Sequence, residues 1–297
     1  MAHDSKHDSY YEINRHWWDG VVPIHEVSRG YNRDGFLRGE KALCPVELAE
    51  LGPLVAGKTL LHLQCHFGMD TLNWARHGAV VTGLDFSLPA LEAARRLSAD
   101  CGVPGRFVHA NVYDAREVLG ETFDVVYTGI GALNWLPDIA AWAHVAAGCV
   151  KPGGVLYVYE GHPLLWMLDA ERADGLLVAK ESYFELAVPV AGEYETTYVD
   201  GPPLTWRKSC EWNHGLGAIV TALVAAGLHI QFVHEHREVP WRALPWMEPS
   251  GEGASGADGR YQSNRMWRLP EAQRNLIPLM YSLLATQPPS RHGEFKE

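Results

Sequence analysis

From about residue 59 the chain alternates short apolar runs with longer amphipathic runs, and this rhythm constrains the fold more than any other feature. Short runs that are apolar throughout are typical of strands covered on both faces; they predict strands over 59–64, 79–84, 105–109, 123–128 and 155–160. The runs between them have helical spacing and predict helices over 69–77, 88–101 and 137–150. Strand-helix-strand units in succession build a parallel sheet.

The rhythm changes after the fifth predicted strand. Aromatic, strand-like pieces at 193–199 and 204–211 are joined by the turn Asp200-Gly201-Pro202-Pro203. They predict a β-hairpin, inserted as a cap within 161–211.

A clear helical pattern resumes at 214–226 and stops at Gly227, which predicts a helix with a glycine at its C-terminal end. Two last strands are predicted near 228–234 and 277–286. The connection between them, 236–276, is predicted to be a long loop that includes Trp241 and a flexible glycine-rich stretch at 251–259.

The composition narrows the classes of partner. The formal net charge of -11 over 297 residues repels polyanions, and the 25 basic residues form no run, so we expect no nucleic-acid substrate. Five scattered cysteines argue against a secreted disulfide framework. The first residues are polar and no stretch approaches the ~20 apolar residues of a membrane helix, so we expect a cytoplasmic protein without a membrane partner. An oligomer is possible, but nothing in the sequence indicates one.

The first chemical motif is the turn after the first predicted strand, where Gly68 precedes a helix. A glycine there allows a close approach of the backbone to a ligand, and the helix N-terminus offers free N–H groups to a carboxylate or phosphate. On its own this turn is equally consistent with a glycine that only closes a tight turn.

The second motif is Asp85, which ends the next predicted strand, 17 residues after Gly68. Open α/β sheets bind ligands beyond the carboxyl ends of their strands, and a carboxylate there can accept both hydrogen bonds of a ribose diol. The alternative is that Asp85 caps the helix that begins near Ser87, the predicted N-cap. After the third strand, the amide of Asn111 and the adjoining backbone can bind an adenine edge.

These motifs belong to a longer series. Across residues 59–160 the segments LLHLQCHFG, TGLDFS, HANVYD, FDVVYT and VKPGG follow in this order. Together they resemble the class I S-adenosylmethionine-dependent methyltransferases that act on small molecules, and the pattern at 214–286 resembles the closing antiparallel strands of that family. The insert and the N-terminal segment carry little of the resemblance.

The resemblance implies an α/β fold, a doubly wound, mostly parallel seven-stranded sheet of the Rossmann-like methyltransferase type with an antiparallel last strand. It divides the chain into an N-terminal helical extension or lid at 1–57, a methyltransferase domain at 58–287 and a tail at 288–297. It also implies S-adenosylmethionine as the cofactor, with the methionine portion at 64–68, the ribose at Asp85 and the adenine at Asn111 and Val112.

The full set of residues expected to bind the cofactor is Gln64, Cys65, His66, Gly68, Asp85, Phe86, Asn111, Val112, Tyr113, Thr128 and Gly129. The chain departs from the family in two places. Many members have GxGxG where this turn has bulkier residues at 64–68, and many have Asp where this chain has Asn111. The cluster of His62, Cys65 and His66 predicts no metal site, because a strand places His62 and Cys65 on opposite faces and no second pair supplies further ligands.

Methyl transfer from a sulfonium is an in-line displacement that mainly requires alignment of the two reactants, and a general base matters only for some acceptors. Glu160 and His162, two positions apart at the end of the fifth predicted strand, are the candidate catalytic pair. A loop histidine bonded to the backbone is an equally good interpretation of His162.

Aromatic residues are dense near the N-terminus, and they predict a lid that presents a π surface to a flat or cationic acceptor. The alternative is that they pack an extra helix onto the sheet. The expected substrate residues are Tyr11, Trp18, His25, Tyr31, Asn134, Trp135 and Trp241. We expect methylation of an N or O atom of a small metabolite, with aromatic or heterocyclic compounds as a plausible class.

The sequence is also consistent with two other functions. An NAD-dependent oxidoreductase shares the first turn and the acid after the second strand, but no G-x-G-x-x-G follows Leu63. A non-methylating protein that binds the same cofactor is the other, since no side chain is indispensable for methyl transfer. A nucleic-acid methyltransferase is disfavoured because 128–131 reads TGIG and not Asn-Pro-Pro-Tyr.

Overall fold

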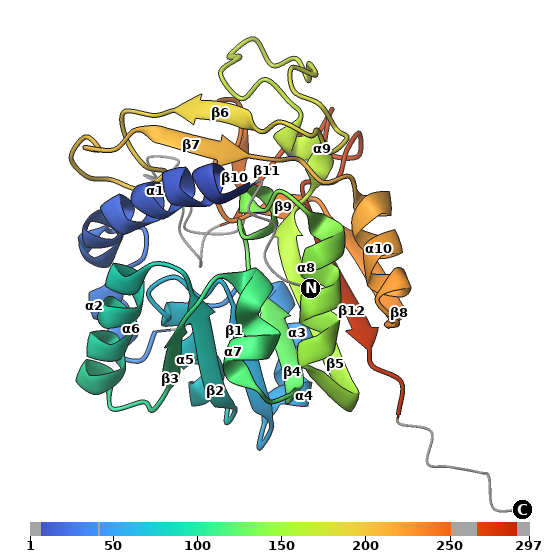
Figure 1. Ribbon diagram of the computed structural model, residues 1–297. Coiled ribbons are helices and arrows are strands. Elements are labelled where there is room, and N and C mark those ends of the chain that lie inside the picture. The colour runs from blue at the N-terminus through green and yellow to red at the C-terminus, as the bar shows by residue number, and fades with distance from the viewer. Residues whose placement is uncertain (1–6, 41, 251–265, 290–297) are drawn as a thin grey trace, which may run out of the picture.

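A seven-stranded sheet forms the centre of the molecule. The computed structural model describes residues 7–40, 42–250 and 266–289. The strand order is β3-β2-β1-β4-β5-β12-β8 (Figure 1). Their bounds are β1 Thr59–Leu63, β2 Val80–Asp85, β3 Arg106–His109, β4 Phe123–Thr128, β5 Val150–Gly161, β8 His229–His236 and β12 Met280–Thr286.

The strand directions confirm the predicted fold class. Strands β1 to β5 pair in parallel, whereas β12 pairs antiparallel with both of its neighbours, β5 and β8. The strand β12, last in the chain, is therefore the antiparallel member that was expected. This order brings the carboxyl ends of β1 to β4 to one edge of the sheet, where ligands of open α/β sheets bind.

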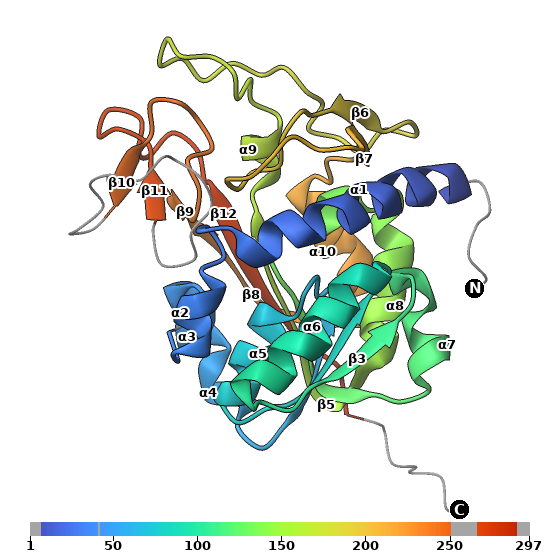
Figure 2. The same cartoon turned by 90° about the vertical axis from the view of Figure 1, so that its left-hand side faces the viewer.

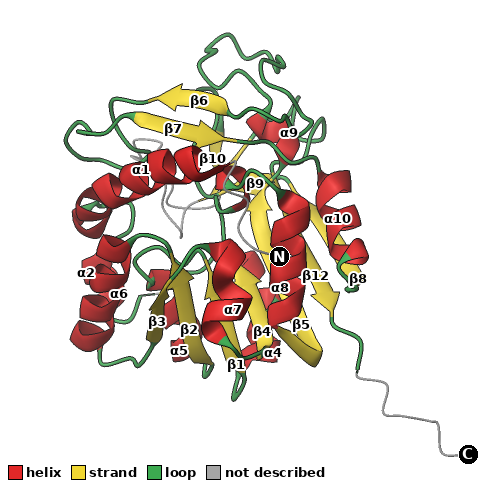
Figure 3. Ribbon diagram, in the orientation of Figure 1, coloured by secondary structure: helices red, strands yellow, loops and turns green. Residues whose placement is uncertain are grey.

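Helices cover both faces of the sheet (Figure 3). Their bounds are α5 Met69–Arg76, α6 Leu88–Cys101, α7 Ala115–Leu119, α8 Ile139–Cys149, α9 Pro163–Trp166 and α10 Leu216–Ala225, with short 3-10 turns at Val112–Asp114 and Leu133–Trp135. Successive residues of a strand point to opposite faces, so Leu61 and Leu63 pack against α8 while Leu60, which precedes them, packs near Trp74 of α5. Continuous apolar strands are the consequence of this two-sided burial.

The predicted helix over 88–101 is confirmed residue for residue, and so is its N-cap. The Ser87 hydroxyl accepts a hydrogen bond from the Ala90 backbone N–H at 3.3 Å, and Gly102 adopts a left-handed conformation at the other end. The other predicted helices and strands of the core are present with ends shifted by a few residues.

The N-terminal segment forms four helices, α1 Asp8–Val27, α2 Arg33–Leu37, α3 Pro45–Glu50 and α4 Gly52–Val55. Helix α1 crosses the molecule between the sheet and a hairpin of β6 Val190–Glu193 and β7 Lys208–Glu211 (Figures 1 and 2). The part of the chain that the structure describes holds no helix long and apolar enough to cross a membrane.

The inserted hairpin exists, but its predicted bounds are wrong. The ladder ends where Glu193 faces Lys208, so 194–207 is the connection and the predicted turn at 200–203 is only its tip. Residues of this connection are instead drawn onto α1, where Val199 and Leu204 are buried beside Trp17. The burial of these residues against α1, which is distant in the sequence, therefore outweighs their local preference to pair as strands.

The segment predicted as one long loop contains three short strands. They are β9 Glu238–Val239, β10 Glu248–Ser250 and β11 Met266–Arg268, which form a small antiparallel sheet in the order β10-β11-β9. The glycine-rich stretch predicted to be flexible, 251–259, lies outside the described residues. Buried Val239 and Trp267 join this small sheet to the main core.

Two polar contacts fix α1 in its position. The Asn14 amide donates to the Cys210 carbonyl at 2.8 Å and accepts from the Cys210 N–H at 2.8 Å, which adds a side chain to the free edge of β7. On the other side, the Ser87 hydroxyl donates to the Asp19 carboxylate at 2.7 Å. The helix is therefore held between the hairpin and the sheet.

We predict that Asn14→Ala lowers the free energy of unfolding by roughly 1–3 kcal/mol, because it leaves the buried N–H and C=O of Cys210 without partners. Urea unfolding measures the change, and hydrogen exchange should show it concentrated in α1 and β7. Glu12→Ala is the control on the same helix, since the exposed Glu12–Arg15 ion pair is worth less than about 1 kcal/mol. Equal effects of the two changes would contradict the assigned role of Asn14.

Candidate active site

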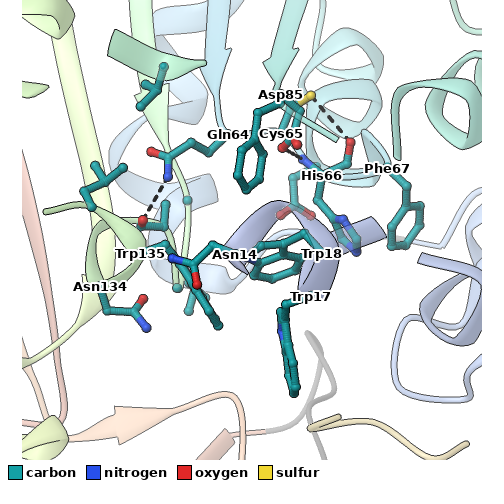
Figure 4. A pocket seen from close by; sticks show the side chains of 18 of the residues that line it. Asn14, Trp17, Trp18, Gln64, Cys65, His66, Phe67, Asp85, Asn134 and Trp135 are labelled. Carbon is teal, nitrogen blue, oxygen red and sulfur yellow. Dashed lines mark hydrogen bonds between the residues drawn. The ribbon is translucent and has the colours of Figure 1, made fainter. Parts of the chain in front are cut away.

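A cavity of about 500 Å³ lies between the carboxyl ends of β1 to β4 and the lid formed by α1 and the hairpin (Figure 4). Its floor comes from the turns that follow these strands. The floor residues are His62, Gln64, Cys65, His66, Phe67, Gly68, Met69, Asp70, Leu84, Asp85, Phe86, Ala110, Asn111, Val112, Gly129, Ile130, Gly131, Ala132, Asn134, Trp135 and Leu136. The rest of its wall is Tyr11, Asn14, Trp17, Trp18, Tyr31, Trp166, Tyr194, Thr196, Thr197, Tyr198, Glu211 and Trp241.

The turn after β1 has a left-handed backbone at every second residue. The φ angles are +59° at Gln64, +50° at His66 and +76° at Gly68. These are the three positions at which the resembled family has GxGxG, so the chain keeps the backbone shape of that turn with two side chains in place of glycines. Each non-glycine residue there costs of order 1 kcal/mol or more, and such strain persists where the surroundings enforce it.

Gly68 lines the cavity with its backbone, and it also has a packing role. A Cβ at this position would lie 2.7 Å from the Phe107 ring and 2.9 Å from the Ala94 Cβ, so it points into the core and not toward a ligand. The glycine is required by its positive φ at the start of α5 and by close packing of that helix against α6 and β3.

The side chains of the turn link it to two other strand ends. The Gln64 amide donates to the Ala132 carbonyl at 2.9 Å, while its Oε1 is buried and has no partner within the described residues. The His66 N–H donates to the Asp85 carboxylate at 2.8 Å, and the Ser87 N–H donates to the other oxygen at 2.9 Å. Burial raises the pKa of Asp85 to about 6.

Asn111 lines the cavity, but its side chain already has a structural partner. Its Oδ1 accepts a hydrogen bond from the Tyr113 N–H at 3.1 Å and so caps the short 3-10 turn that follows. Tyr113 itself bonds through its hydroxyl to the Asp138 carbonyl and does not line the cavity. Thr128 is fully buried behind the floor, whereas Gly129 lies on it.

The structure contradicts the expectation that Glu160 and His162 face the substrate, because neither lines the cavity. The buried Glu160 carboxylate accepts hydrogen bonds from the N–H groups of Gly131, Ala132 and Leu133 and from that of Gly161. It thereby fixes the loop after β4.

The ring of His162 is likewise engaged away from the cavity. Its Nδ1 accepts from the Leu164 N–H at the start of α9, and its Nε2 lies 3.1 Å from the Glu235 carboxylate. The two residues therefore have structural roles, which corrects the predicted catalytic pair.

Aromatic rings form the roof, and most of the predicted substrate residues are among them. Trp18 of α1 lies with its ring centroid 5.1 Å from that of Trp135 and 5.1 Å from that of His66 (Figure 4). Trp241 stacks on Trp166 at 5.6 Å. Sequence reasoning missed several of the lining aromatics, among them Trp17, Trp166, Tyr194 and Tyr198.

His25 was expected to touch substrate, but it lies behind the cavity wall. Its Nδ1 is 2.9 Å from Nε2 of His66, and its Nε2 is 2.7 Å from the Thr197 hydroxyl. Burial and the neighbouring His66 hold the pKa of His25 well below its usual value, so the ring is neutral. These two hydrogen bonds of His25 connect the lid helix to the turn after β1 and to the hairpin connection.

Three carboxylates line the cavity, and two of them were not predicted. They are Asp70 in the first turn of α5, Asp85 at the end of β2 and Glu211 at the end of β7. No lysine or arginine is among the described lining residues. The only signal for Asp70 in the sequence is its place two residues after Gly68, where an acid also suits a helix N-terminus.

Asp70 lies beside a second, fully buried acid, Glu47 of α3. The Glu47 carboxylate is hydrogen-bonded to the Tyr127 hydroxyl and to the Cys44 N–H. Burial and the nearby Asp70 raise the pKa of Glu47, and burial raises the pKa of Asp70 to about 7. The pair therefore takes up protons near neutral pH.

Comparison with known proteins agrees with this geometry. Residues 61–156 match the family model of a methyltransferase domain. Two ubiquinone biosynthesis O-methyltransferases are related in sequence, from Photorhabdus laumondii (34% identity, 35% of this chain and 42% of the relative) and Salmonella arizonae (31% identity, 44% and 55%). The chain thus spans about half the length of these curated relatives.

Solved structures show the same fold. The CcbJ methyltransferase from Streptomyces caelestis superimposes with a TM-score of 0.56 at 14% identity, over 92% of this chain and 98% of that one. An S-adenosylmethionine-dependent methyltransferase from Mesorhizobium loti gives a TM-score of 0.50 at 19% identity, over 84% and 100%. The protein has the Rossmann-like α/β fold of these enzymes. Within this fold, segment 61–156 is the part that matches the family model of a methyltransferase domain.

We predict that Gln64→Gly is more stable than Gln64→Ala by about 1 kcal/mol, because both remove the same side chain and only alanine keeps the left-handed strain. Thermal or urea unfolding of the two variants gives the difference. The matched control is exposed Glu92 in the middle of α6, where alanine should be the more stable substitution by a similar amount. The same sign at both positions would contradict a strained turn.

Proposed function

We propose that the protein is an S-adenosylmethionine-dependent methyltransferase that methylates an N or O atom of a small molecule. The observation that carries this proposal is the arrangement of the left-handed turn at 64–68, the Asp85 carboxylate and the end of β3 around one cavity. The sequence likeness to O-methyltransferases supports the same class of reaction.

The polar atoms of the cavity floor fit this cofactor. Gln64 Oε1 is a buried acceptor without a partner in the described chain, which suits the ammonium of a bound amino acid portion. Each oxygen of Asp85 accepts one backbone N–H and keeps a lone pair for a ribose hydroxyl. The amide nitrogen of Asn111 makes no hydrogen bond within the described residues and is available to an adenine.

When bound, S-adenosylmethionine supplies a methyl group on a positively charged sulfur. The residues of this chain contribute binding and alignment, which are the main requirements of an in-line displacement. Helix α1 lines the side of the cavity that faces the strand ends, and the hydrogen bond from Gln64 to Ala132 holds the turns after β1 and β4 together. No side chain that was predicted to be a general base faces this space.

The charges that line the cavity also help to distinguish between substrate classes and between a methyltransferase and an NAD-dependent oxidoreductase. With three carboxylates and no described lysine or arginine in its lining, it is unsuited to a polynucleotide, which supports a small-molecule acceptor. An NAD-dependent oxidoreductase would place a pyrophosphate against this floor. The three carboxylates of the lining disfavour a pyrophosphate there, because like charges repel each other at close range.

We predict that S-adenosylhomocysteine binds the purified protein and that Asp85→Ala weakens its binding by roughly tenfold or more, because two hydroxyl donors lose a charged acceptor. Isothermal titration calorimetry measures both. Asp174→Ala, at an exposed position outside the cavity, is the control and should bind normally. Binding of NADH without any binding of S-adenosylmethionine would refute the proposal, and formation of S-adenosylhomocysteine in a metabolite mixture would separate catalysis from binding alone.

A further inference from the structure

Among the described residues of the cavity lining, the buried side-chain atoms that lack a hydrogen-bond partner are all acceptors. Among the described lining residues, the buried side-chain atoms without a partner are Gln64 Oε1 and Asn134 Oδ1. The Asp70 carboxylate also has no hydrogen bond or ion pair to any described residue. A ligand that satisfies this cavity must therefore bring donors.

The three carboxylates differ in how far they are already satisfied. Asp85 accepts two backbone N–H groups. Glu211 accepts from Asn134 Nδ2 at 3.1 Å, from the Ser209 hydroxyl at 3.1 Å and from the Tyr194 hydroxyl at 3.3 Å. Asp70 is left as the acidic group that has no partner among the described residues.

The described surroundings of Asp70 contain further acidic groups and no positively charged partner. The titratable groups that face it are Glu47 and Cys44 beside α3, Tyr127 on β4 and Tyr198 of the hairpin connection. Each of these four groups is neutral when protonated and negative when ionised, so none of them supplies a positive charge. An ionised Asp70 without a cation is therefore unfavourable, and a ligand that carries a positive charge relieves it.

The rest of the cavity wall suits a cation that is attached to an apolar body. Five tryptophans and four tyrosines line it, including the stacked pair of Trp166 and Trp241. Faces of such rings attract ammonium groups and bury hydrocarbon rings at the same time. An anionic acceptor would meet three carboxylates and no described lysine or arginine.

We propose that Asp70 binds a protonated amine of the methyl acceptor, so that the acceptors of this enzyme are small ring-bearing amines and not carboxylates or phosphates. The inference rests on the proposed function, since it names the class of methyl acceptor that the same cavity would bind. Asp70 acts as a specificity-determining residue that anchors the substrate.

The test uses three probes that share a phenol ring and differ in charge: tyramine, 4-ethylphenol and 3-(4-hydroxyphenyl)propionate. Their binding to the full chain saturated with S-adenosylhomocysteine is measured by calorimetry or NMR titration at pH 8. We expect tyramine to bind roughly tenfold or more tightly than 4-ethylphenol, and the propionate to bind weakest. In Asp70→Asn the advantage of tyramine over 4-ethylphenol should disappear.

Each other outcome is informative. If S-adenosylhomocysteine fails to bind the unaltered protein, the proposed function fails. If it binds but the probes show no preference for the cation, the inference alone is overturned. Glu211→Gln is the matched change at the other acid, and loss of the preference there but not in Asp70→Asn would assign the amine to Glu211. A tenfold loss of S-adenosylhomocysteine affinity in Asp70→Asn would assign Asp70 to the cofactor instead.

We predict a pH dependence that a merely structural role would not produce. A carboxyl with a raised pKa is protonated below that pKa, and only the ionised form pairs with an ammonium. Because burial raises the pKa of Asp70 to about 7, tyramine affinity should fall about tenfold per unit as the pH drops below 7 and change little above 8. The affinity of 4-ethylphenol should stay constant from pH 5.5 to 8, and parallel profiles for the two probes would contradict the assignment.

Discussion

The left-handed turn between β1 and α5 is the constraint on which the rest of the site depends. Its two strained residues hold three other segments: Gln64 bonds to Ala132 after β4, the His66 N–H bonds to Asp85 after β2, and the His66 ring contacts His25 of the lid helix. Each strained residue costs of order 1 kcal/mol or more, and its side chain supplies a contact that glycine lacks. Compared with the GxGxG turn of the resembled family, this turn is more strained, but it is hydrogen-bonded to the lid helix.

Much of the fold could be predicted because its information is local. A strand buried on both faces has to be apolar throughout, so 123–128 is evident in the sequence, and Ser87 with Gly102 marks both ends of α6. The hairpin was misplaced because the position of its strands depends on a helix almost two hundred residues earlier. Val199 is buried by α1, and no local pattern records that contact.

The site shows the same division between topology and contacts. Gln64, Asp85 and Asn111 could be placed on the cavity because parallel strands end at one edge of a sheet. Glu160 also lies at the end of such a strand, but its carboxylate accepts hydrogen bonds from four backbone N–H groups, mostly of the loop after β4. Asp70 was missed for the opposite reason, since an acid in the first turn of a helix needs no other explanation. The tertiary contacts of the folded chain, and not its sequence motifs, decide which carboxylates find hydrogen-bond donors within the protein.

Burial gives Asp70 two properties that belong together. A carboxyl shielded from water beside Glu47 favours its neutral form, which is why its pKa is raised and why the fold tolerates it. The same shielding makes the attraction of the ionised form for a cation stronger than it would be at an exposed position. A proton and an ammonium group are then alternative partners of one carboxylate. A buried carboxyl that serves a ligand lowers the stability of the fold itself, whereas buried hydrogen bonds such as those of Asn14 to Cys210 raise it.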